Sequence, residues 1–362
     1  MKKNILFSTT RQWNPGDEFI LFGIINLIKE IVTDFNPIIY NRNPEVRQTR
    51  QYLNIFRKSK YCSKPFKGRG YLESFFRIGF WDNSFKDEMN LEFIDLVVFA
   101  GTPEWKGPRL LPLYKKLLNF NNPIIYLGLG GTKKYKHEEL KSPYIDVLKK
   151  ATLITVRDTL AYNELKFLNP YYLPCPSLFS SLHEKKIGKV KKVGLIFSTY
   201  KSVLYNKLEE KAYRYILKLY NFLQQTYSHN FSFEIICHYI NELPEAVKIF
   251  RNMKIHYSYD AKDYFNIYKE FDLVIGPRVH GIGISASMGI PGIIISHDER
   301  AATAKGFLAE IININESFEK VISKFEKIIT DIKNKNSELI FFKNEKKKIY
   351  LNLLRNALFG HS

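Results

Sequence analysis

The stretch DLVIGPRVHGIGISASMGIPGIIIS, residues 272–296, predicts a complete β-α-β unit. An apolar run at 272–276 ends in Gly-Pro, and a segment rich in glycine and small residues follows. Gly289 and Pro291 end this helical segment before the next apolar run, 292–296. Apolar runs without alternating polar residues are typical of parallel strands that helices cover on both faces. The stretch therefore indicates a doubly wound α/β sheet.

Arg278 and His280 stand where this strand ends and the helix begins. In open α/β sheets, ligands bind beyond the carboxyl ends of the strands, where helix N-termini expose N–H groups and a partial positive charge. A fixed cation and a titratable ring at this junction predict an anion site. Gly281 would let a ligand approach the backbone, and Ser285 would add a hydroxyl donor. The alternative is a glycine-rich helix packed closely on the sheet beside a surface arginine.

The same alternation of strands and helices extends over the rest of the chain. It breaks at residues 173–192, where Pro, Ser and Lys gather, and we interpret that segment as an interdomain linker. We therefore expect two doubly wound, Rossmann-like α/β domains, residues 1–180 and 190–335, that face each other across a cleft. The expected strands lie at residues 4–10, 37–41, 95–101, 122–130 and 153–158 in the first half and at 193–200, 233–239, 254–259, 272–276 and 292–296 in the second.

Two segments stand outside this pattern. Residues 42–93 form an aromatic and basic insertion, which either packs as a helical subdomain of its own or caps the cleft. Residues 336–362 predict a C-terminal helix with apolar residues beside lysines. Such a helix either docks across both domains or lies on an anionic membrane surface.

The charge of the chain is its unusual bulk property. Its 362 residues include 55 Lys and Arg against 36 Asp and Glu, a net charge of +19. This balance favours anionic partners such as phosphates, nucleic acid or a membrane surface, although a biased base composition of the genome would produce it too. No recognised nucleic-acid module accompanies the charge, so we expect no nucleic-acid partner.

Cysteines and apolar runs indicate the compartment. The three cysteines, Cys62, Cys175 and Cys237, are far apart and form no C-x-x-C pair, which fits a reducing compartment. The first apolar run is too short for a signal peptide, and no run reaches the roughly 18 residues of a spanning helix. We expect a cytoplasmic protein, with peripheral contact to the inner membrane surface as a second possibility.

Further candidate residues follow the other predicted strands. Asp17 lies where the first helix begins, as its N-cap or as a carboxylate that binds an acceptor hydroxyl. Arg157 ends the fifth strand, where it either pairs with Asp158 or adds a second cation to the anion site. The carboxyl ends of parallel strands meet at one edge of a sheet, so we also expect the following residues in the binding site: Gly16, Gly101, Thr102, Gly130 and Gly131.

These motifs, in this order, resemble the polysaccharide pyruvyl transferase family. The resemblance rests on NPGDE at 14–18, RD at 157–158 and above all RVHGIGISASMGIP at 278–291, followed by Asp298. It covers most of the chain and implies a glycosyltransferase-B-like fold. The family moves the enolpyruvyl unit of phosphoenolpyruvate onto a sugar and forms a cyclic pyruvate ketal, in surface-polysaccharide assembly.

The resemblance also implies roles for individual residues. Arg157 and Arg278 would hold the phosphate and carboxylate of phosphoenolpyruvate, and His280, with a pKa near neutrality, would be the general acid. Asp298 would bind substrate together with a basic residue that takes the place of the family's usual lysine. This residue is either Lys305 or Arg300. Two features depart from the family: the sequence AGTPEW where many members have a glycine cluster, and Cys175 where an aspartate is common. Both departures concern the acceptor, which is a saccharide, free or carried on a lipid diphosphate. We expect the acceptor on the side of the first domain and phosphoenolpyruvate on the side of the second.

Other functions remain open from the residues alone. The nearest is a nucleotide-sugar-dependent glycosyltransferase of the same architecture, although the helix after His280 has no acidic residue to bind a ribose and no D-x-D motif is present. A non-enzymatic basic binding protein would explain the charge but not the Arg278 and His280 junction. The eight histidines show no spacing of metal ligands, so no metal and no cofactor are expected.

Overall fold

The first sheet of the computed structural model is parallel and has the order β2-β1-β3-β4-β5-β6. The structure describes residues 2–9, 14–41, 89–101, 110–131, 140–200 and 208–360. Central strands such as β3 and β4 are apolar and buried throughout, because helices cover both faces of the sheet. The strands are β1 (Lys3–Thr9), β2 (Phe35–Asn41), β3 (Leu96–Ala100), β4 (Ile124–Leu129), β5 (Leu153–Val156) and β6 (Tyr171–Tyr172).

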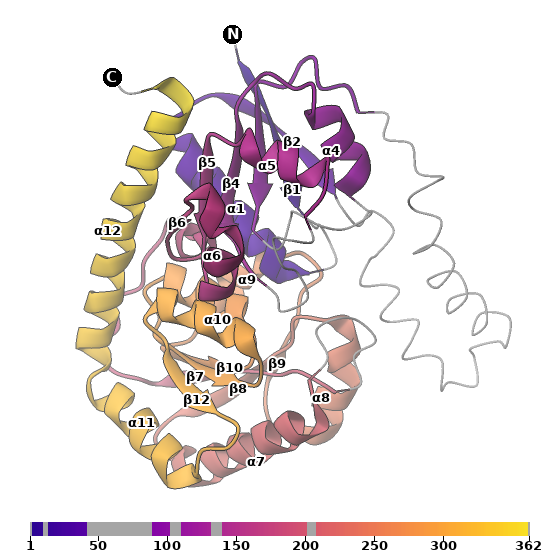
Figure 1. Cartoon of the computed structure of the whole chain (residues 1–362). Helices are drawn as coiled ribbons and strands as arrows, with labels where there is room; N and C mark the ends of the chain where they lie inside the picture. The colour runs from indigo at the N-terminus through magenta and orange to yellow at the C-terminus, as the bar shows by residue number, and fades with distance from the viewer. Residues whose placement is uncertain are drawn as a thin grey trace, which may run out of the picture.

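The second sheet is also parallel, with the order β12-β11-β10-β7-β8-β9. It lies below the first sheet in Figure 1. Chain order reverses between β1 and β3 in the first sheet and between β7 and β10 in the second, and ligands of doubly wound proteins bind at these switch points. The strands are β7 (Lys192–Ile196), β8 (Ser232–Ile236), β9 (Ile255–His256), β10 (Leu273–Gly276), β11 (Gly292–Ser296) and β12 (Glu310–Asn313).

Helices connect the strands and cover the sheets (Figure 1). The α-helices are α1 (Pro15–Lys29), α4 (Leu111–Leu117), α5 (Tyr144–Lys149), α6 (Thr159–Leu165), α7 (Glu210–Tyr227), α8 (Leu243–Ile249), α9 (Asp263–Tyr268), α10 (Val279–Ser287), α11 (Phe318–Thr330) and α12 (Ile332–Phe359). Short 3₁₀ helices are η3 (Lys166–Leu168), η4 (Pro176–Phe179), η5 (Ile240–Glu242) and η6 (Glu299–Phe307). None of the described helices is long and apolar enough to cross a membrane.

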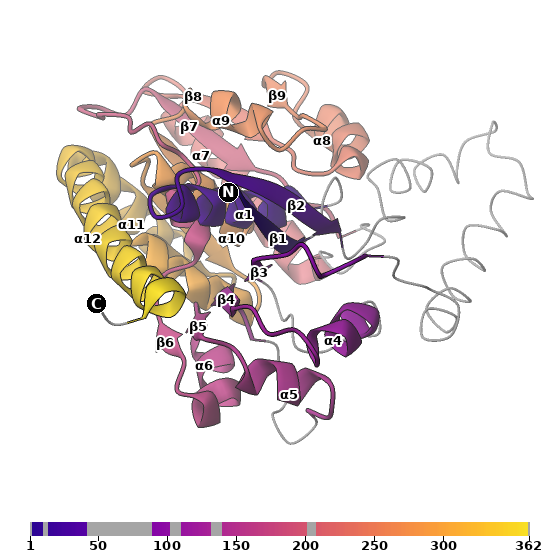
Figure 2. The same cartoon turned by 90° about the horizontal axis from the view of Figure 1, so that it is seen from above.

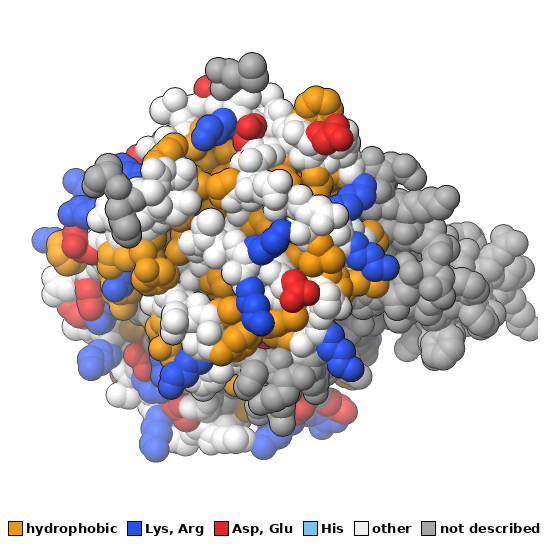
Figure 3. All heavy atoms as spheres, turned by 45° about the horizontal axis from the view of Figure 1, so that its top comes forward, with side chains coloured by type: hydrophobic (Ala, Val, Ile, Leu, Met, Phe, Trp, Pro, Cys, Tyr) orange, Lys and Arg blue, Asp and Glu red, His pale blue; other side chains and the backbone are white. Residues whose placement is uncertain are grey.

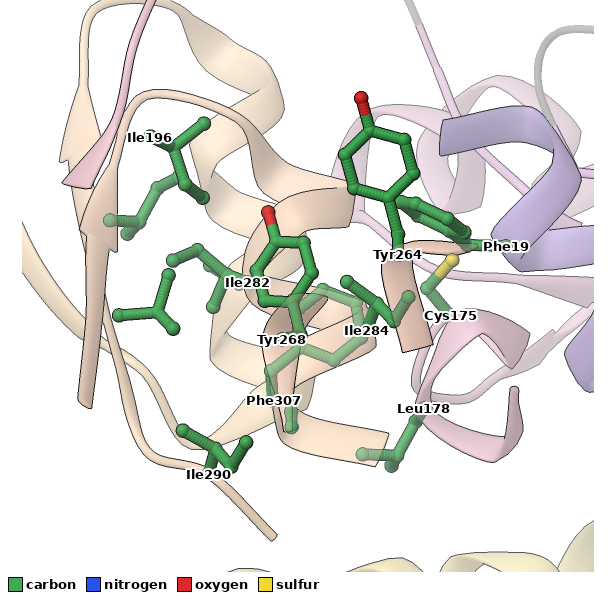
Figure 4. Close-up of a cluster of buried hydrophobic side chains, with 14 of the residues drawn as sticks. Phe19, Cys175, Leu178, Ile196, Tyr264, Tyr268, Ile282, Ile284, Ile290 and Phe307 are labelled. Carbon is green, nitrogen blue, oxygen red and sulfur yellow. The ribbon is translucent and has the colours of Figure 1, made fainter. Parts of the chain in front are cut away.

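A continuous apolar core joins the two sheets. Figure 4 shows Phe19 of α1 beside Cys175, which precedes η4, and Tyr264 of α9 beside Ile284 of α10, with Leu178 of η4 below them. The Phe19 ring lies edge-on to Tyr264, with centroids 5.8 Å apart. These side chains belong to one buried cluster that includes residues of both sheets. In the segment predicted as a linker, residues 173–181 are buried, and η4 packs on α1 and α10, whereas most of residues 182–192 are exposed.

Helix α12 runs along one side of the molecule, past both sheets (Figures 1 and 2). Beside the second sheet, the Lys343 ammonium donates hydrogen bonds to the backbone oxygens of Ser181 and Ser287. Toward the first sheet, the Tyr350 hydroxyl donates to the Pro174 backbone oxygen over 2.8 Å. The helix begins at Ile332, four residues before the predicted boundary, because Asp331 alone separates it from α11.

The structure adds two strands that the sequence patterns did not indicate, β6 and β12. Each is an edge strand, and β6 has only two residues, both exposed. Short strands paired on one side lack the long apolar run that marks a buried strand. Most of the predicted insertion, residues 42–88, lies outside the described residues.

Candidate functional site

The N-termini of α1 and α10 meet between the two sheets. A Cβ atom on Gly16, in the first turn of α1, would lie 2.6 Å from Nδ1 of His280, in the first turn of α10. The first N–H groups of a helix have no partner within it and carry a partial positive charge. Two such helix ends therefore converge on His280, each following a strand at a switch point of its sheet.

The Arg157 guanidinium covers the strand ends of the first sheet. A Cβ on Gly130 would lie 2.5 Å from Nη2 and 2.6 Å from Nε of Arg157, so only glycine leaves room there. Gly101, with a φ of 68°, lies against the same side chain. The Arg157 Nη1 donates weakly to Sγ of Cys175 over 3.7 Å, and its Nε is buried without a hydrogen-bond partner among the described residues. Unlike Arg278, Arg157 contacts no carboxylate in the part of the chain that the structure describes.

Arg278 is held by the second sheet. Its Nη2 lies 2.5 Å from Oε1 of Glu242, which is fully buried. Oε2 of Glu242 accepts the backbone N–H groups of His238 and Tyr239 over 2.9 and 3.0 Å. Burial raises the pKa of Glu242, while Arg278 and these N–H groups act in the opposite direction. The carboxylate therefore fixes the guanidinium in place and balances its charge.

Tyr239 connects this arrangement to the other sheet. The Arg278 guanidinium lies over the Tyr239 ring, 4.6 Å from its centroid. The Tyr239 hydroxyl donates a hydrogen bond to Oδ1 of Asn14 over 2.9 Å. The same Oδ1 accepts the backbone N–H of Gly16 over 3.0 Å and caps α1. The bond from Tyr239 to Asn14 thus joins the two helix ends that face the site.

His280 is neutral in this environment. Burial, with the nearby charges of Arg157 and Arg300, lowers the pKa of His280 well below its ordinary value. Its Nε2 is buried and has no hydrogen-bond partner among the described residues. The predicted pKa near neutrality is therefore wrong for the site without a ligand, because the sequence alone does not show how deeply the ring is buried. An anion bound beside these cations would raise the pKa again.

Asp298 and Arg300 follow β11 at the same edge of the second sheet. The Asp298 carboxylate caps η6 and accepts a hydrogen bond from Nε of Arg300 over 2.9 Å. Arg300 is near enough to act on the pKa values of both His280 and Tyr239. Lys305 is exposed near the far end of η6 and has no such effect in the described site. Of the two basic residues left open by the sequence, Arg300 is the one that lies near His280.

Other predicted residues have structural roles. The Ser285 hydroxyl donates to the Ile282 backbone oxygen within α10, and a Cβ on Gly281 would strike Ile196 and Tyr268. For these two residues the structure fits the alternative stated above, a glycine-rich helix that packs closely on its neighbours. The Gly131 N–H donates to Asp158, which caps α6, so Asp158 does not pair with Arg157.

Asp17 is not the cap of α1 as predicted, because Asn14 has that position. Asp17 is buried in the first turn of α1, and its charge acts on Tyr239, so it lies near the site. The predicted Thr102 lies outside the described residues.

Sequence reasoning missed Asn14, Tyr239 and Glu242 as site residues. Asn14 precedes a proline where a helix starts, and this pair is a signal for a helix N-cap that the sequence contains. Tyr239 and Glu242 carry no local signal of a role, since only the fold brings them to Arg278. In the described ranges, no group of three or more His, Cys, Asp or Glu side chains is placed to hold a metal ion.

The positive charge is dispersed over the visible face in Figure 3. Lys and Arg side chains there are scattered among apolar and neutral ones, with Asp and Glu between them. The described part of this face therefore shows no continuous basic patch. The arginines at the switch points are a separate, local concentration of charge.

Comparison with known proteins supports both the fold and the family. The family described as polysaccharide pyruvyl transferase matches residues 14–299. No curated protein matches. Among solved structures, a S. aureus MnaA-UDP co-structure has a TM-score of 0.52 at 16% identity, with 100% of this chain and 98% of that one covered.

Two further structures are similar. UDP-GlcNAc 2-epimerase from Neisseria meningitidis, bound to UDP-GlcNAc, has a TM-score of 0.54 at 15% identity and covers 98% of this chain and 99% of its own. UDP-GlcNAc 2-epimerase from Methanocaldococcus jannaschii has a TM-score of 0.51 at 13% identity, with 90% and 92% covered. At these identities the likeness shows the fold alone, and it confirms the predicted glycosyltransferase-B-like class.

Proposed function

Because the chain belongs to the polysaccharide pyruvyl transferase family, we propose that it transfers the enolpyruvyl unit of phosphoenolpyruvate to a saccharide and forms a pyruvate ketal. One observation carries the proposal for the donor: where two helix N-termini meet, Arg157 and His280 present buried nitrogen atoms that have no hydrogen-bond partner among the described residues. A site of cations and helix ends suits a donor that carries a phosphate and a carboxylate.

The two arginines have different tasks in this proposal. Among the described residues Arg157 contacts the Cys175 sulfur and no carboxylate, so its charge is available to the donor. Arg278 shares its charge with Glu242, so its task is to orient one acidic group of the donor. Arg300 lies nearby and adds charge, although Asp298 balances part of it. The donor is thus attracted chiefly by Arg157 and the helix ends.

His280 becomes an acid only when the donor is bound. Burial lowers the pKa of His280, and the charges of Arg157 and Arg300 lower it further. The negative charge of phosphoenolpyruvate would offset these two arginines and so raise this pKa, which favours uptake of a proton by the ring as the donor binds. The protonated ring then gives this proton to the methylene carbon, which leaves an oxocarbenium-like centre at the neighbouring carbon. In the empty site the ring is neutral, so it holds no acidic proton that it could lose to water before the donor binds.

The acceptor completes the reaction. One sugar hydroxyl attacks the cationic carbon, and its proton replaces the one that His280 gave. Loss of phosphate regenerates the cation, and a neighbouring hydroxyl of the same sugar attacks it and closes the ketal. The second hydroxyl proton leaves to the phosphate or to water, so one phosphate is released for each ketal formed. We propose no metal or cofactor in these steps.

A second candidate is a nucleotide-sugar enzyme, since the similar solved structures include complexes with UDP and UDP-GlcNAc. In that case the α10 N-terminus would bind a diphosphate. Helix α10 has no acidic residue that would bind a ribose, which disfavours this function.

Calorimetric titration separates the two functions. Phosphoenolpyruvate and a panel of UDP-sugars are titrated into the wild type, Arg157→Ala and Arg278→Ala. Saturable binding of phosphoenolpyruvate that is lost in Arg157→Ala supports pyruvyl transfer. Binding of a UDP-sugar without binding of phosphoenolpyruvate would replace it with the nucleotide-sugar function.

A further inference from the structure

Tyrosines follow two neighbouring strands of the second sheet at its carboxyl edge. Tyr239 lies three residues beyond β8. Tyr257 directly follows β9, the edge strand, and Tyr259 lies two residues further along. We call these three residues the tyrosine row. Because the strands are parallel and adjacent, the row lies along the same edge as Arg278 and the α10 N-terminus.

The row is continuous with the donor site. The Tyr239 ring lies under the Arg278 guanidinium and is only 3% exposed. Tyr257 is half-buried, and its pKa is raised by burial and by the charge of Glu242, the partner of Arg278. Tyr259 is 40% exposed. Exposure thus increases from Arg278 outward along the edge.

The segment that carries the outer tyrosines is held rigidly. The Tyr264 hydroxyl of α9 donates to the backbone oxygen of Cys237, and the N–H of Ser258 donates to the same hydroxyl. The Ser258 hydroxyl donates to Asp263 and accepts the N–H of Asp260. Rings on such a fixed turn lose little freedom when a ligand packs on them.

Resting on the proposed function, we propose that Tyr257 and Tyr259 form an acceptor subsite that binds a neutral sugar unit of the acceptor saccharide. A tyrosine offers an apolar ring face to the C–H face of a pyranose and a hydroxyl for its polar groups. The occupant is a sugar and not a second anion, because the partly exposed side chains of the subsite carry no positive charge.

Distance decides which sugar unit the subsite binds. Three strand spacings, roughly 14 Å, separate β10 from β9. A sugar on Tyr259 is therefore too far from His280 to be the reacting unit. The subsite binds a unit next to it, so the enzyme selects an oligosaccharide or polymer acceptor over a monosaccharide.

Saturation-transfer NMR with neutral sugars tests the subsite. The probes are lactose, cellobiose, maltose and chitobiose, each compared with the methyl glycosides of its component sugars. We expect at least one disaccharide to bind more tightly than its methyl glycosides. Tyr259→Ala should weaken disaccharide binding about 5- to 10-fold. Tyr259→Phe, which keeps the ring, should retain most of the binding.

Tyr171→Ala is the matched control, since Tyr171 is 51% exposed on the edge strand of the other sheet. It should leave disaccharide binding unchanged. Circular dichroism and calorimetric binding of phosphoenolpyruvate, measured on each variant, show that the fold and the donor site are intact. If the wild type fails to bind phosphoenolpyruvate, the proposed function is contradicted. The sugar titrations test the subsite alone, so the two failures can be distinguished.

Three results would overturn the subsite. The first is no disaccharide binding by the wild type, and the second is unchanged binding in the variant that combines Tyr257→Ala with Tyr259→Ala. The third is loss of UDP binding in that variant without any effect on sugars, because the rings would then stack on a nucleotide base.

Discussion

His280 illustrates how the environment sets the chemistry of a single residue. Free histidine titrates near neutral pH, but burial and two arginines keep this ring neutral. Its Nδ1 edge faces Gly16, and its buried Nε2 has no partner within the described chain. A neutral ring in a cationic site is a proton acceptor that an arriving anion converts into a donor.

The His280→Gln variant should separate binding from turnover. Arg157 and both helix ends remain, so phosphoenolpyruvate should bind within a few-fold of the wild-type affinity. Turnover should fall by about 10²- to 10⁴-fold, which is the usual contribution of a general acid. Calorimetry and a phosphate-release assay measure the two quantities. Wild-type turnover in this variant would remove His280 from the proton transfer.

His238 should make the folded state sensitive to acid. Burial lowers the pKa of His238 to about 3, whereas in the unfolded chain it titrates near its ordinary 6.5. The unfolded state therefore binds a proton first as the pH falls. The stability is complete above pH 6.5 and decreases toward pH 3, at a rate of up to about 1.4 kcal/mol per pH unit.

Urea unfolding at pH 7, 6 and 5 measures this dependence. The His238→Gln variant keeps a polar group near Tyr268, the partner of His238, and removes the titration. Its free energy of unfolding should change less between pH 7 and 5 than that of the wild type. Equal slopes in the two proteins would assign the acid sensitivity to other groups.

At the scale of elements, glycines at strand ends make room for the arginine. Gly130 follows β4 and Gly101 follows β3, and the Arg157 side chain from the end of β5 extends across both. A Cβ on Gly130 would lie in the space that the guanidinium occupies, whereas a Cβ on Gly101 would first meet Ile20, at 2.7 Å. Gly130 therefore makes room for the Arg157 side chain, whereas Gly281 and Gly283 allow α10 to pack on its neighbours.

Gly130→Ala should displace Arg157 without unfolding the protein. The new methyl group would lie 2.5 to 2.8 Å from the guanidinium atoms, so the side chain must move. We expect affinity for phosphoenolpyruvate to fall about tenfold or more, since a charge-assisted hydrogen bond contributes roughly 1.5–3 kcal/mol. Gly188→Ala is the control, because nothing lies within 4 Å of its added Cβ. If both variants bind phosphoenolpyruvate with similar affinity, Arg157 does not bind the donor from its position against Gly130.

At the scale of the whole molecule, the two sheets share one core. Interfaces between domains of a chain are commonly polar and allow relative motion unless they are large and apolar. Here α1 packs on α10 and η4 through buried side chains, and α12 binds both sides through Lys343 and Tyr350. We infer that the two halves fold as one cooperative unit.

Thermal unfolding tests this cooperativity. Far-UV and near-UV circular dichroism should report a single, coincident transition. Phe19→Ala, which removes a fully buried ring between the sheets, should lower the stability by about 3–5 kcal/mol and keep one transition. Phe341→Ala, at a 69% exposed position on α12, should have little effect. Two separated transitions in the wild type would show that the halves unfold independently.

The sequence by itself determined the parts that depend on local pattern. Apolar runs located the central strands, because a strand buried on both faces must be apolar along its length. The switch from strand to helix at Arg278 and His280, and the residues that resemble the family, located one side of the site. The sequence patterns did not predict the edge strands β6 and β12, since an edge strand does not have to be apolar along its length.

Only the tertiary structure decided the partners and the charge states of the site. Glu242 and Tyr239 contact Arg278, which is more than 30 residues away in the chain. Asn14 and Tyr239 are hydrogen-bonded although 225 residues separate them. The pKa of His280 follows from burial beneath elements of both sheets. Such contacts depend on how the sheets pack, and a local pattern carries no information about the distance between residues that are far apart in the chain.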